Sequence, residues 1–233
     1  MNTTSGRSQY DLEVARRGPN LLAYERALVK RGEVVVGLDE VGRGALAGPL
    51  TVGAVVVTHA TRPPKGLNDS KQLTPEERES LVAPLESWAS DWSLGSASSQ
   101  EIDRWGLRVA LAVAANRAMA GLSLIPTHAL IDGPFNLLDA PLRLEDELLE
   151  VPPLPFATIS HTTLIKGDGR SATIAAASVL AKVHRDRAMV GLAGEFPIYG
   201  WDANKGYGVP QHLAALEDEG PCCHHRLTWK LTS

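Results

Sequence analysis

The sequence predicts an α/β domain with a mixed five-stranded sheet flanked by helices and a small helical extension at its C-terminal end. Short runs rich in valine and threonine, which are typical of strands, alternate with longer segments whose apolar residues recur at helical spacing. Their order, with three early strands, then a helix, two further strands and another helix, is that of a mixed sheet. At 233 residues and 44% hydrophobic content, the chain can bury the core of one such domain.

The N-terminal part of the chain opens with a polar stretch, residues 1–20, that we expect to be flexible. Leucines at helical spacing predict a short helix over 21–31, and the apolar run after it predicts the first strand over 33–39. Valine and threonine predict a second strand over 49–58. A threonine, a proline and a glutamate then form a capping box that begins a helix over 74–88.

The middle of the chain repeats the alternation of strands and helices. Apolar residues on one face predict a third strand over 91–98, and helical spacing predicts a helix over 99–121. A fourth strand is expected over 127–132 and a fifth over 156–164, each with a short run of strand-forming residues. A glycine-rich loop then opens a long alanine-rich helix over 172–192.

The tail is expected to extend this domain. Apolar spacing predicts a last helix over 210–219. No repeat or low-complexity segment interrupts the chain. We therefore expect a single domain over residues 21–233, with a C-terminal helical extension from about residue 193.

The charge of the chain argues against nucleic-acid binding through bulk positive charge. The formal net charge is -4 and the pI is near 6.0, so such binding needs a local basic patch. No apolar run approaches the roughly 20 residues that span a bilayer, and residues 1–20 lack the apolar core of a signal peptide. The adjacent Cys222 and Cys223 fit neither a disulfide framework nor the usual spacing of a zinc site. We therefore expect a cytoplasmic protein with no membrane association.

Carboxylates stand at or just after the ends of the predicted strands: Asp39, Glu40, Asp132 and Asp168. Strand ends in an α/β sheet gather at one edge, where active sites form. Neighbouring residues of a strand point to opposite faces, so Asp39 and Glu40 can share a site only if the strand is ending there or the metal site wraps around its tip. Carboxylate oxygens suit Mg²⁺ or Mn²⁺, and two such ions can support an in-line phosphoryl displacement by water. The sequence therefore predicts a metal-dependent site at this edge.

The glycines after the first strand allow a second interpretation. Gly42-x-Gly44 could begin a dinucleotide-binding loop. That loop must open a helix, whereas the segment after Gly48 reads as a strand, with a proline at its start. A nucleotide-binding loop is therefore disfavoured.

Several segments together carry a resemblance to a known family. They are Asp39-Glu40-Val41-Gly42-Arg43-Gly44 with Ala47-Gly48-Pro49, Asp69-Ser70-Lys71, Ile131-Asp132-Gly133, Lys166-Gly167-Asp168, the run from Ala175 to Val183, and Lys205-Gly206-Tyr207. Each is a weak signal alone. In this order, over residues 33–229, they resemble ribonuclease HII.

The resemblance implies a ribonuclease H-like fold and endonucleolytic hydrolysis of the RNA strand of RNA-DNA hybrids. It also implies incision at single ribonucleotides embedded in duplex DNA, with 3'-hydroxyl and 5'-phosphate products. Mg²⁺ or Mn²⁺ is the implied cofactor, and hybrids and ribonucleotide-containing duplex DNA are the implied partners. We expect the chain to act as a monomer.

Carried over by position, the metal-binding acids of the family fall on the four carboxylates named above, and its Gly-Arg-Gly motif falls on Gly42, Arg43 and Gly44. Glycines let the backbone approach a sugar-phosphate, where the 2'-hydroxyl distinguishes RNA from DNA. Tyr207 matches a tyrosine that packs against the nucleotide at the RNA-to-DNA junction. An aromatic ring makes such a contact whatever the base.

Basic residues around these motifs form a candidate phosphate-binding set: Lys71, Lys166, Arg170, Lys182, Arg185, Lys205 and Arg226. Each of them could instead be a solvated surface charge. Lys71 and Lys166 are favoured because both lie in motif loops. Loss of a phosphate contact weakens binding and flattens its salt dependence.

Some of these residues also have simpler explanations. Asp168 could be an acid favoured by a helix N-terminus, Asp132 an ordinary turn residue, and Tyr207 a packing residue. Asp186 competes as a fourth site acid, but it follows Lys182 at the spacing of a helical surface ion pair. We prefer the ion pair for Asp186 and the site roles for the others.

The sequence departs from the family pattern in its tail. Asn204 stands where many members have histidine, and Cys222-Cys223-His224 is an unusual lead into the following His-Arg pair. These departures leave catalysis intact and put fine substrate preference in doubt. Rival functions are a nuclease of the same fold that cuts DNA junctions, a binding module that has lost catalysis, and a nucleotide-binding protein.

Overall fold

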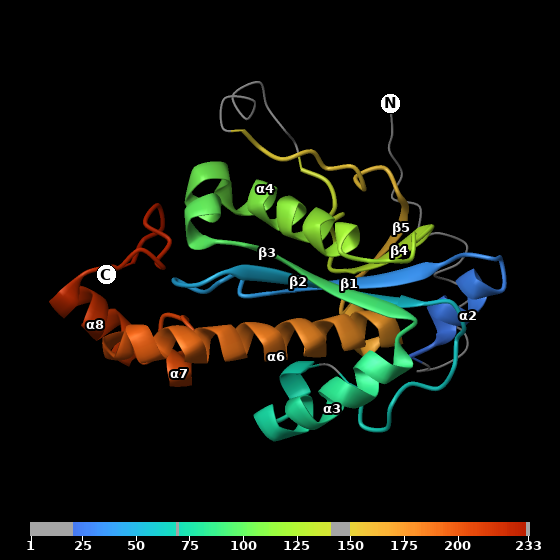
Figure 1. Cartoon of the computed structure of the whole chain (residues 1–233), viewed down its shortest axis with the longest axis horizontal. Coiled ribbons are helices and arrows are strands. Elements are labelled where there is room, and N and C mark those ends of the chain that lie inside the picture. Colours follow the sequence, from blue (N-terminus) through green and yellow to red (C-terminus); the bar gives the residue numbers. More distant parts are fainter. Residues whose placement is uncertain (1–20, 69, 141–149, 232–233) are drawn as a thin grey trace.

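One central sheet with helices on both faces forms the body of the computed structural model (Figure 1). The structure describes residues 21–68, 70–140 and 150–231. The segment 1–20, for which flexibility is expected, and Asp69 of the Asp-Ser-Lys motif lie outside these ranges. Among the described residues, none of the helices is long and apolar enough to cross a membrane.

The sheet is mixed, as predicted, with its strands in the order β3-β2-β1-β4-β5. β1 pairs antiparallel with β2, and β2 with β3, whereas β1 and β4, and β4 and β5, run parallel. Because β1, β4 and β5 point the same way, their C-terminal ends share one edge. The strands are β1 Val35–Val41, β2 Leu50–Val57, β3 Asp91–Ala97, β4 His128–Asp132 and β5 Ser160–Leu164.

Two strands, β1 and β5, differ from their predicted bounds by more than one residue at an end. β1 continues through both acids to Val41, with Asp39 opposite Gly53 of β2. β5 begins only at Ser160, so the predicted strand start at 156 is wrong. There the backbone amide of Ile159 donates to the carbonyl of Phe156 at 3.2 Å, and both side chains pack on the core. Turn formation lets those two apolar residues face the same way, which a strand would not allow.

The helices match the apolar patterns closely. Thr74 caps its helix as predicted, accepting from the amide of Glu77 while the Glu77 carboxylate accepts from the amide of Thr74. The α-helices are α2 Ala23–Val29, α3 Pro75–Trp88, α4 Ser99–Ala120, α6 Ala172–Glu195, α7 Trp201–Asn204 and α8 Pro210–Glu219. Short 3-10 turns are η1 Ser70–Gln72, η2 Gly167–Gly169 and η3 Pro197–Tyr199.

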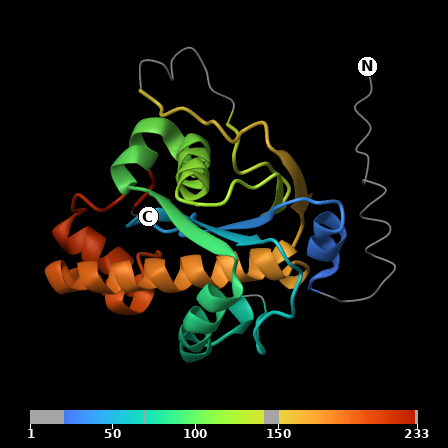
Figure 2. The same ribbon diagram turned by 45° about the vertical axis from the view of Figure 1, so that its right-hand side comes forward.

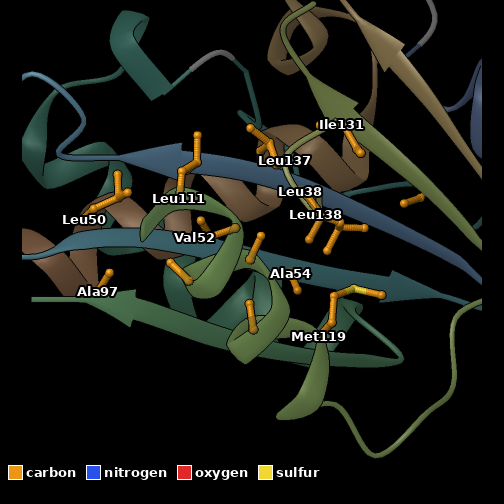
Figure 3. Packing of buried hydrophobic residues seen from close by; sticks show 14 of the residues in the cluster. Leu38, Leu50, Val52, Ala54, Ala97, Leu111, Met119, Ile131, Leu137 and Leu138 are labelled. Atoms are coloured by element: carbon orange, nitrogen blue, oxygen red, sulfur yellow. The ribbon is translucent and has the colours of Figure 1, made fainter. Parts of the chain in front are cut away.

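The two faces of the sheet are covered by different helices. α4 lies on one face, and α6 with α3 lies on the other, as the two views of the ribbon show (Figures 1 and 2). On the α4 side, Leu38 and Val52 of the sheet belong to the same buried cluster as Leu111 and Met119 of the helix (Figure 3). Burial of such side chains stabilises each by about 1.5 to 3 kcal/mol.

α6 lies unusually close to the middle of the sheet. A β-carbon on Gly37 of β1 would collide with the backbone of Thr173 and Ile174 at the start of the helix. Small, fully buried alanines continue the contact along α6, among them Ala175 and Ala176. The close approach brings Ser178 of α6 up to the acidic end of β1, where it makes a hydrogen bond to Asp39.

The C-terminal tail packs on the far end of α6. Trp201 of α7 is fully buried there against Met189 of α6 and Leu216 of α8. The same tail joins the segment that follows β1. The amide of Leu46 donates to Gly206 at 2.8 Å, and the amide of Arg226 donates to the carbonyl of Leu46 at 2.9 Å.

Candidate active site

Asp39 and Glu40 lie at the end of β1 and line the same cavity, of about 360 Å³. Asp39 is 6% exposed, and its Oδ1 accepts from the backbone amide of Glu40 at 2.8 Å. The chain turns immediately afterwards, at Gly42, where φ is +83°. The early turn satisfies the condition under which two neighbouring acids of a strand can serve one site.

Asp132 and Asp168 come from the ends of the other two parallel strands, β4 beside β1 and β5 beside β4. Asp132 is the last residue of β4, and its Oδ1 accepts from the amide of Gly167 at 2.6 Å. Asp168 follows in η2, just beyond β5, and is 3% exposed. Its Oδ2 lies 3.7 Å from Nζ of Lys71. The four predicted acids therefore lie along one edge of the sheet.

The electrostatics of Asp39, Glu40 and Asp132 couple them into one group. Burial raises the pKa of Asp39 well above its usual value, and the charges of Glu40 and Asp132 raise it further, against the hydrogen bond from Ser178. The pKa of Glu40 is also raised by burial, and Asp132 adds to the rise. Arg43 opposes it, with NH1 3.5 Å from the Glu40 carboxylate. Like charges held this close favour a proton or a cation.

The side chains as they stand do not form a closed cage. Within the ranges 21–68, 70–140 and 150–231, no three histidine, cysteine, aspartate or glutamate side chains converge closely enough to hold one ion together. The donor set still suits a hard cation, because Mg²⁺ keeps several waters and needs only one or two carboxylates. The residues present therefore fit an open, hydrated magnesium or manganese site.

Ser70 and Ser178 belong to this site although no role was predicted for them. Their hydroxyl oxygens lie 2.7 Å apart, and Ser178 also makes the hydrogen bond to Asp39. A sequence signal did exist, since Ser178 is the polar residue in an otherwise apolar run of α6. The burial of that helix face is what makes a lone serine informative.

The Gly-Arg-Gly turn is held from behind by Arg226. Its guanidinium donates to the carbonyls of Gly42 at 2.6 Å and of Arg43 at 2.8 Å. Gly42 has no room for a side chain, since a β-carbon there would lie 2.7 Å from the carbonyl of Pro49. Gly44 faces open space, and Arg43 is exposed beside Glu40. The turn thus presents its backbone and one exposed guanidinium to the cavity.

Tyr207 lies on the rim of the same cavity as Asp39 and Glu40. Lys182 Nζ is 5.8 Å and Arg185 Cζ 5.6 Å from the centre of its ring. The structure therefore brings Tyr207 to the acids, as the site role requires.

The phosphate-binding prediction is wrong for Arg185 and Arg226, which are 1% and 0% exposed. Arg185 donates to the carbonyls of Pro49, Ala47 and Lys205 at 2.8 to 3.2 Å. Buried cations are rare, and here backbone carbonyls replace water as acceptors. Both arginines are therefore internal braces for the loops around the site.

The other predicted cations reach the surface. Lys71 and Lys166 are both exposed. Lys71 forms an ion pair with Asp168, and Lys166 precedes Asp168 by two residues in the chain. Arg170 donates to the Tyr24 hydroxyl at 2.5 Å. Lys182 pairs with Asp186 at 2.8 Å, which confirms the surface ion pair expected for Asp186.

The fold is shared with proteins of known class. A crystal structure of ribonuclease H2 from Pyrococcus horikoshii OT3 superposes with a TM-score of 0.65 at 26% identity, over 85% of this chain and 94% of that one. A structure of Bst-RNase HIII in complex with Mn²⁺ has a TM-score of 0.62 at 18% identity, over 100% of this chain and 74% of that one. The fold and the acidic sheet edge thus define a hydrolase, a nuclease of the ribonuclease H class.

The sequence comparisons narrow this class to one family. The model of the family described as Ribonuclease HII matches residues 36–232. A ribonuclease HII of Streptomyces griseus is 47% identical over 198 residues, covering 84% of this chain and 76% of the relative. The chain belongs to the ribonuclease HII family, and its activity is that of a ribonuclease H on RNA-DNA hybrids.

Proposed function

We propose that this ribonuclease HII cuts the RNA strand of hybrids and also incises duplex DNA at single embedded ribonucleotides. The observation that carries the proposal is the coupled group of Asp39, Glu40 and Asp132 beside a cavity that Tyr207 also lines. The acids supply the site of reaction, and the Gly-Arg-Gly turn and the tyrosine supply contacts that one ribonucleotide alone can satisfy.

We propose Mg²⁺ or Mn²⁺ as the cofactor, held by Asp39, Glu40, Asp132 and Asp168. The raised pKa values of Asp39 and Glu40 support it, because repulsion and burial favour a bound cation as they favour a proton. Two such ions, when bound, supply activation of water and neutralisation of the charge that develops at phosphorus. The Mn²⁺ complex of Bst-RNase HIII is a precedent for such a metal in a protein of this fold.

The reaction proposed is hydrolysis of one phosphodiester bond. The oxygen of water bonds to phosphorus, the bond from phosphorus to the 3' oxygen breaks, and the products end in a 3'-hydroxyl and a 5'-phosphate. Lys71 and Lys166 contact phosphates of the substrate, and Gly42 and Gly44 let the backbone approach the 2'-hydroxyl. Tyr207 packs against the nucleotide at the RNA-to-DNA junction.

The test uses three duplexes of equal length: all DNA, DNA with one ribonucleotide, and an RNA-DNA hybrid. Each is incubated with the protein and Mg²⁺ or Mn²⁺, and the ends of the products are determined. Incision at the ribonucleotide with a 3'-hydroxyl end is the expected result. Cutting of the all-DNA duplex would favour a junction-type nuclease, and binding without cutting would favour a module that has lost catalysis.

We also propose that the protein works in the cytoplasm and as a monomer. Both described cysteines are free, which agrees with a reducing compartment. The acids, the turn and Tyr207 all come from one chain. Analytical ultracentrifugation at the protein concentrations used in the cleavage assay tests whether the protein is a monomer. A dimer at those concentrations would contradict the proposal.

A further inference from the structure

A buried chain of hydrogen bonds connects the C-terminal tail to Tyr207. Nδ1 of His212, in the first turn of α8, lies 2.9 Å from the carbonyl oxygen of Tyr207. Nε2 of His212 lies 3.1 Å from Nε1 of Trp201 and 3.0 Å from Nε2 of His225. Nδ1 of His225 in turn lies 3.0 Å from the amide nitrogen of Cys222. Both histidines are buried, His212 at 0% and His225 at 1% exposure.

The indole of Trp201 fixes where the protons of this chain lie. An indole nitrogen can only donate, so Nε2 of His212 is an acceptor and the proton of neutral His212 is on Nδ1. His212 therefore donates to the carbonyl of Tyr207. His225 must donate from its own Nε2 to His212, which leaves its Nδ1 to accept the amide hydrogen of Cys222. Every polar atom of both rings is satisfied in one arrangement of protons.

The surroundings keep both rings neutral. Burial lowers the pKa of His212, and burial with the neighbouring His212 lowers that of His225 to about 4. The rings of Tyr199 and Trp201 pack on His225, with centroids 4.6 and 5.3 Å away. A backbone hydrogen bond with Cys222 opposes the fall in the pKa of His225, and the neighbouring His224 adds to it. A proton added to either imidazole would place two N–H groups face to face.

The carbonyl that His212 holds belongs to the residue at the cavity rim. Tyr207 sits in a short bend, in which its amide donates to Asn204 at 3.0 Å and its carbonyl accepts from Val209 at 2.9 Å. The Asn204 side chain braces the same bend by accepting from the amide of Gly206 at 2.8 Å. His212 ties the carbonyl of Tyr207 itself to the packed interior of the tail, while Asn204 Nδ2 ties the start of the bend to the carbonyl of Tyr199 at 2.7 Å.

We propose that His212 is a positioning residue, which sets the place of Tyr207 at the substrate cavity by donating from Nδ1 to its carbonyl. The inference rests on the proposed role of Tyr207 as the contact for the nucleotide at the junction. His225 and Trp201 act one step further out, by allowing only the tautomer that makes the donation possible. Without it the carbonyl of Tyr207 keeps only the bond from the amide of Val209, and the residue is held less firmly at the cavity it shares with Asp39 and Glu40.

A matched pair of substitutions separates the positioning contact from general packing. Asn in place of His212 puts an amide nitrogen where Nδ1 stands and keeps the donor to Tyr207. Gln reaches the position of Nε2 instead and loses that donor. We expect His212→Gln to lower kcat/KM on duplex DNA with one ribonucleotide by about tenfold, the cost of one buried hydrogen bond, and His212→Asn to restore most of it.

A double-mutant cycle with Tyr207→Ala distinguishes a positioning role of His212 from a purely structural one, because it measures whether the effect of His212 depends on the Tyr207 ring. If His212 acts through Tyr207, the loss caused by His212→Gln disappears in the Tyr207→Ala background. An equal loss in both backgrounds would overturn the proposal, and so would equal losses in the Asn and Gln variants. Thermal unfolding of each variant shows that the folded protein is being compared.

The unmodified protein gives an independent test. Nitrogen NMR of the imidazoles at pH 7 is expected to show His212 protonated at Nδ1 and His225 at Nε2. Protonation of His212 at Nε2 would overturn the proposal even if every variant failed to fold. Absence of incision by the unmodified protein would instead overturn the proposed function, so the two failures are distinguishable.

Discussion

Asp39 and Glu40 are adjacent in the chain and both face one cavity, because β1 ends one residue later and the chain turns at Gly42. Burial raises both pKa values, repulsion by Asp132 adds to both, and repulsion by Glu40 adds to that of Asp39. At the scale of single residues, the opposing contacts of Arg43 and Ser178 leave a net repulsion that a divalent cation relieves. This is the physical basis of the metal dependence we propose.

Asp132→Asn should lower turnover by at least about a hundredfold, the usual scale for loss of a group that stabilises charge in the transition state. Binding of the duplex should change little, because the variant keeps every lysine and arginine that could contact a phosphate. The measurement is single-turnover cleavage beside a binding titration. Asp186→Asn is the matched control, since Asp186 pairs with Lys182, and it should keep normal cleavage. Unchanged turnover in Asp132→Asn would refute the site.

Lys71→Gln and Lys166→Gln should each weaken binding of all duplexes and reduce the slope of log K against log salt by about 0.9. The reason is that each removes one contact with a phosphate, which carries no sequence information. Titrations between low and moderate salt give the slope. Lys30→Gln, before the opposite end of β1, should leave the slope as it is. If the slope is unchanged in the Lys71 and Lys166 variants as well as in the Lys30 control, neither lysine contacts a phosphate.

The placement of site residues could be predicted best where a motif contains groups typical of a reaction. It could be predicted worst where the burial of a side chain decides what it binds. Strand ends predicted that the four acids lie at one edge of the sheet, and the family resemblance pointed to Tyr207 beside them; the roles of these residues remain predictions. Arg185 and Arg226 were misassigned because their acceptors are carbonyls of residues more than a hundred positions away, apart from Lys205. Composition says that arginine is usually exposed, and only the fold shows the exception.

At the scale of elements, the packing of α6 on β1 sets the depth of the site. The helix carries Ser178 to Asp39, and the absence of a side chain at Gly37 allows that approach. Strand and helix order could be predicted because apolar periods and caps are local signals. The start of β5 could not, because Phe156 and Ile159 are strand-forming residues that the core holds in a turn.

Gly37→Ala should destabilise the protein by about 2 to 3 kcal/mol, because the added methyl group meets the backbone at the start of α6 and the chain must shift. Urea unfolding followed by circular dichroism gives the value. Gly191→Ala in the same helix has open space around it and should stabilise by up to about 1 kcal/mol. Equal stability of the Gly37 variant and the original chain would show that the helix is free to move away.

At the scale of the whole molecule, the buried histidines make stability depend on pH. The pKa of His225 is about 4 in the folded protein and 6.5 without burial. The unfolded chain therefore takes up the proton first, and stability falls as pH drops from 6.5 toward 4, by an amount on the order of 2 kcal/mol. Burial raises the pKa of Glu25, Asp39 and Glu40, which act in the opposite sense.

The comparison with His225→Gln isolates this contribution. Gln keeps a donor toward His212 and has no proton to gain. We expect the difference in unfolding free energy between pH 7 and pH 5 to be smaller in the variant, as measured by urea titration. The same difference in both proteins would show that folding does not lower the pKa of His225.

The division of the chain into a single domain, residues 21–233, with a C-terminal extension from about residue 193 remains a prediction.

The Gly-Arg-Gly turn can take its final conformation only after Arg226 has been synthesised, because Arg226 holds two of its carbonyls. Synthesis makes the Gly-Arg-Gly turn more than 180 residues before its brace Arg226, which holds the carbonyls of Gly42 and Arg43. The bend at Tyr207 likewise waits for His225. A growing chain can thus assemble its sheet and its acids before the turn and the bend, for which we propose contacts to the ribonucleotide, are held in place. A product of translation that stops before residue 212 would carry the acids without the contacts that hold the proposed ribonucleotide-reading surface.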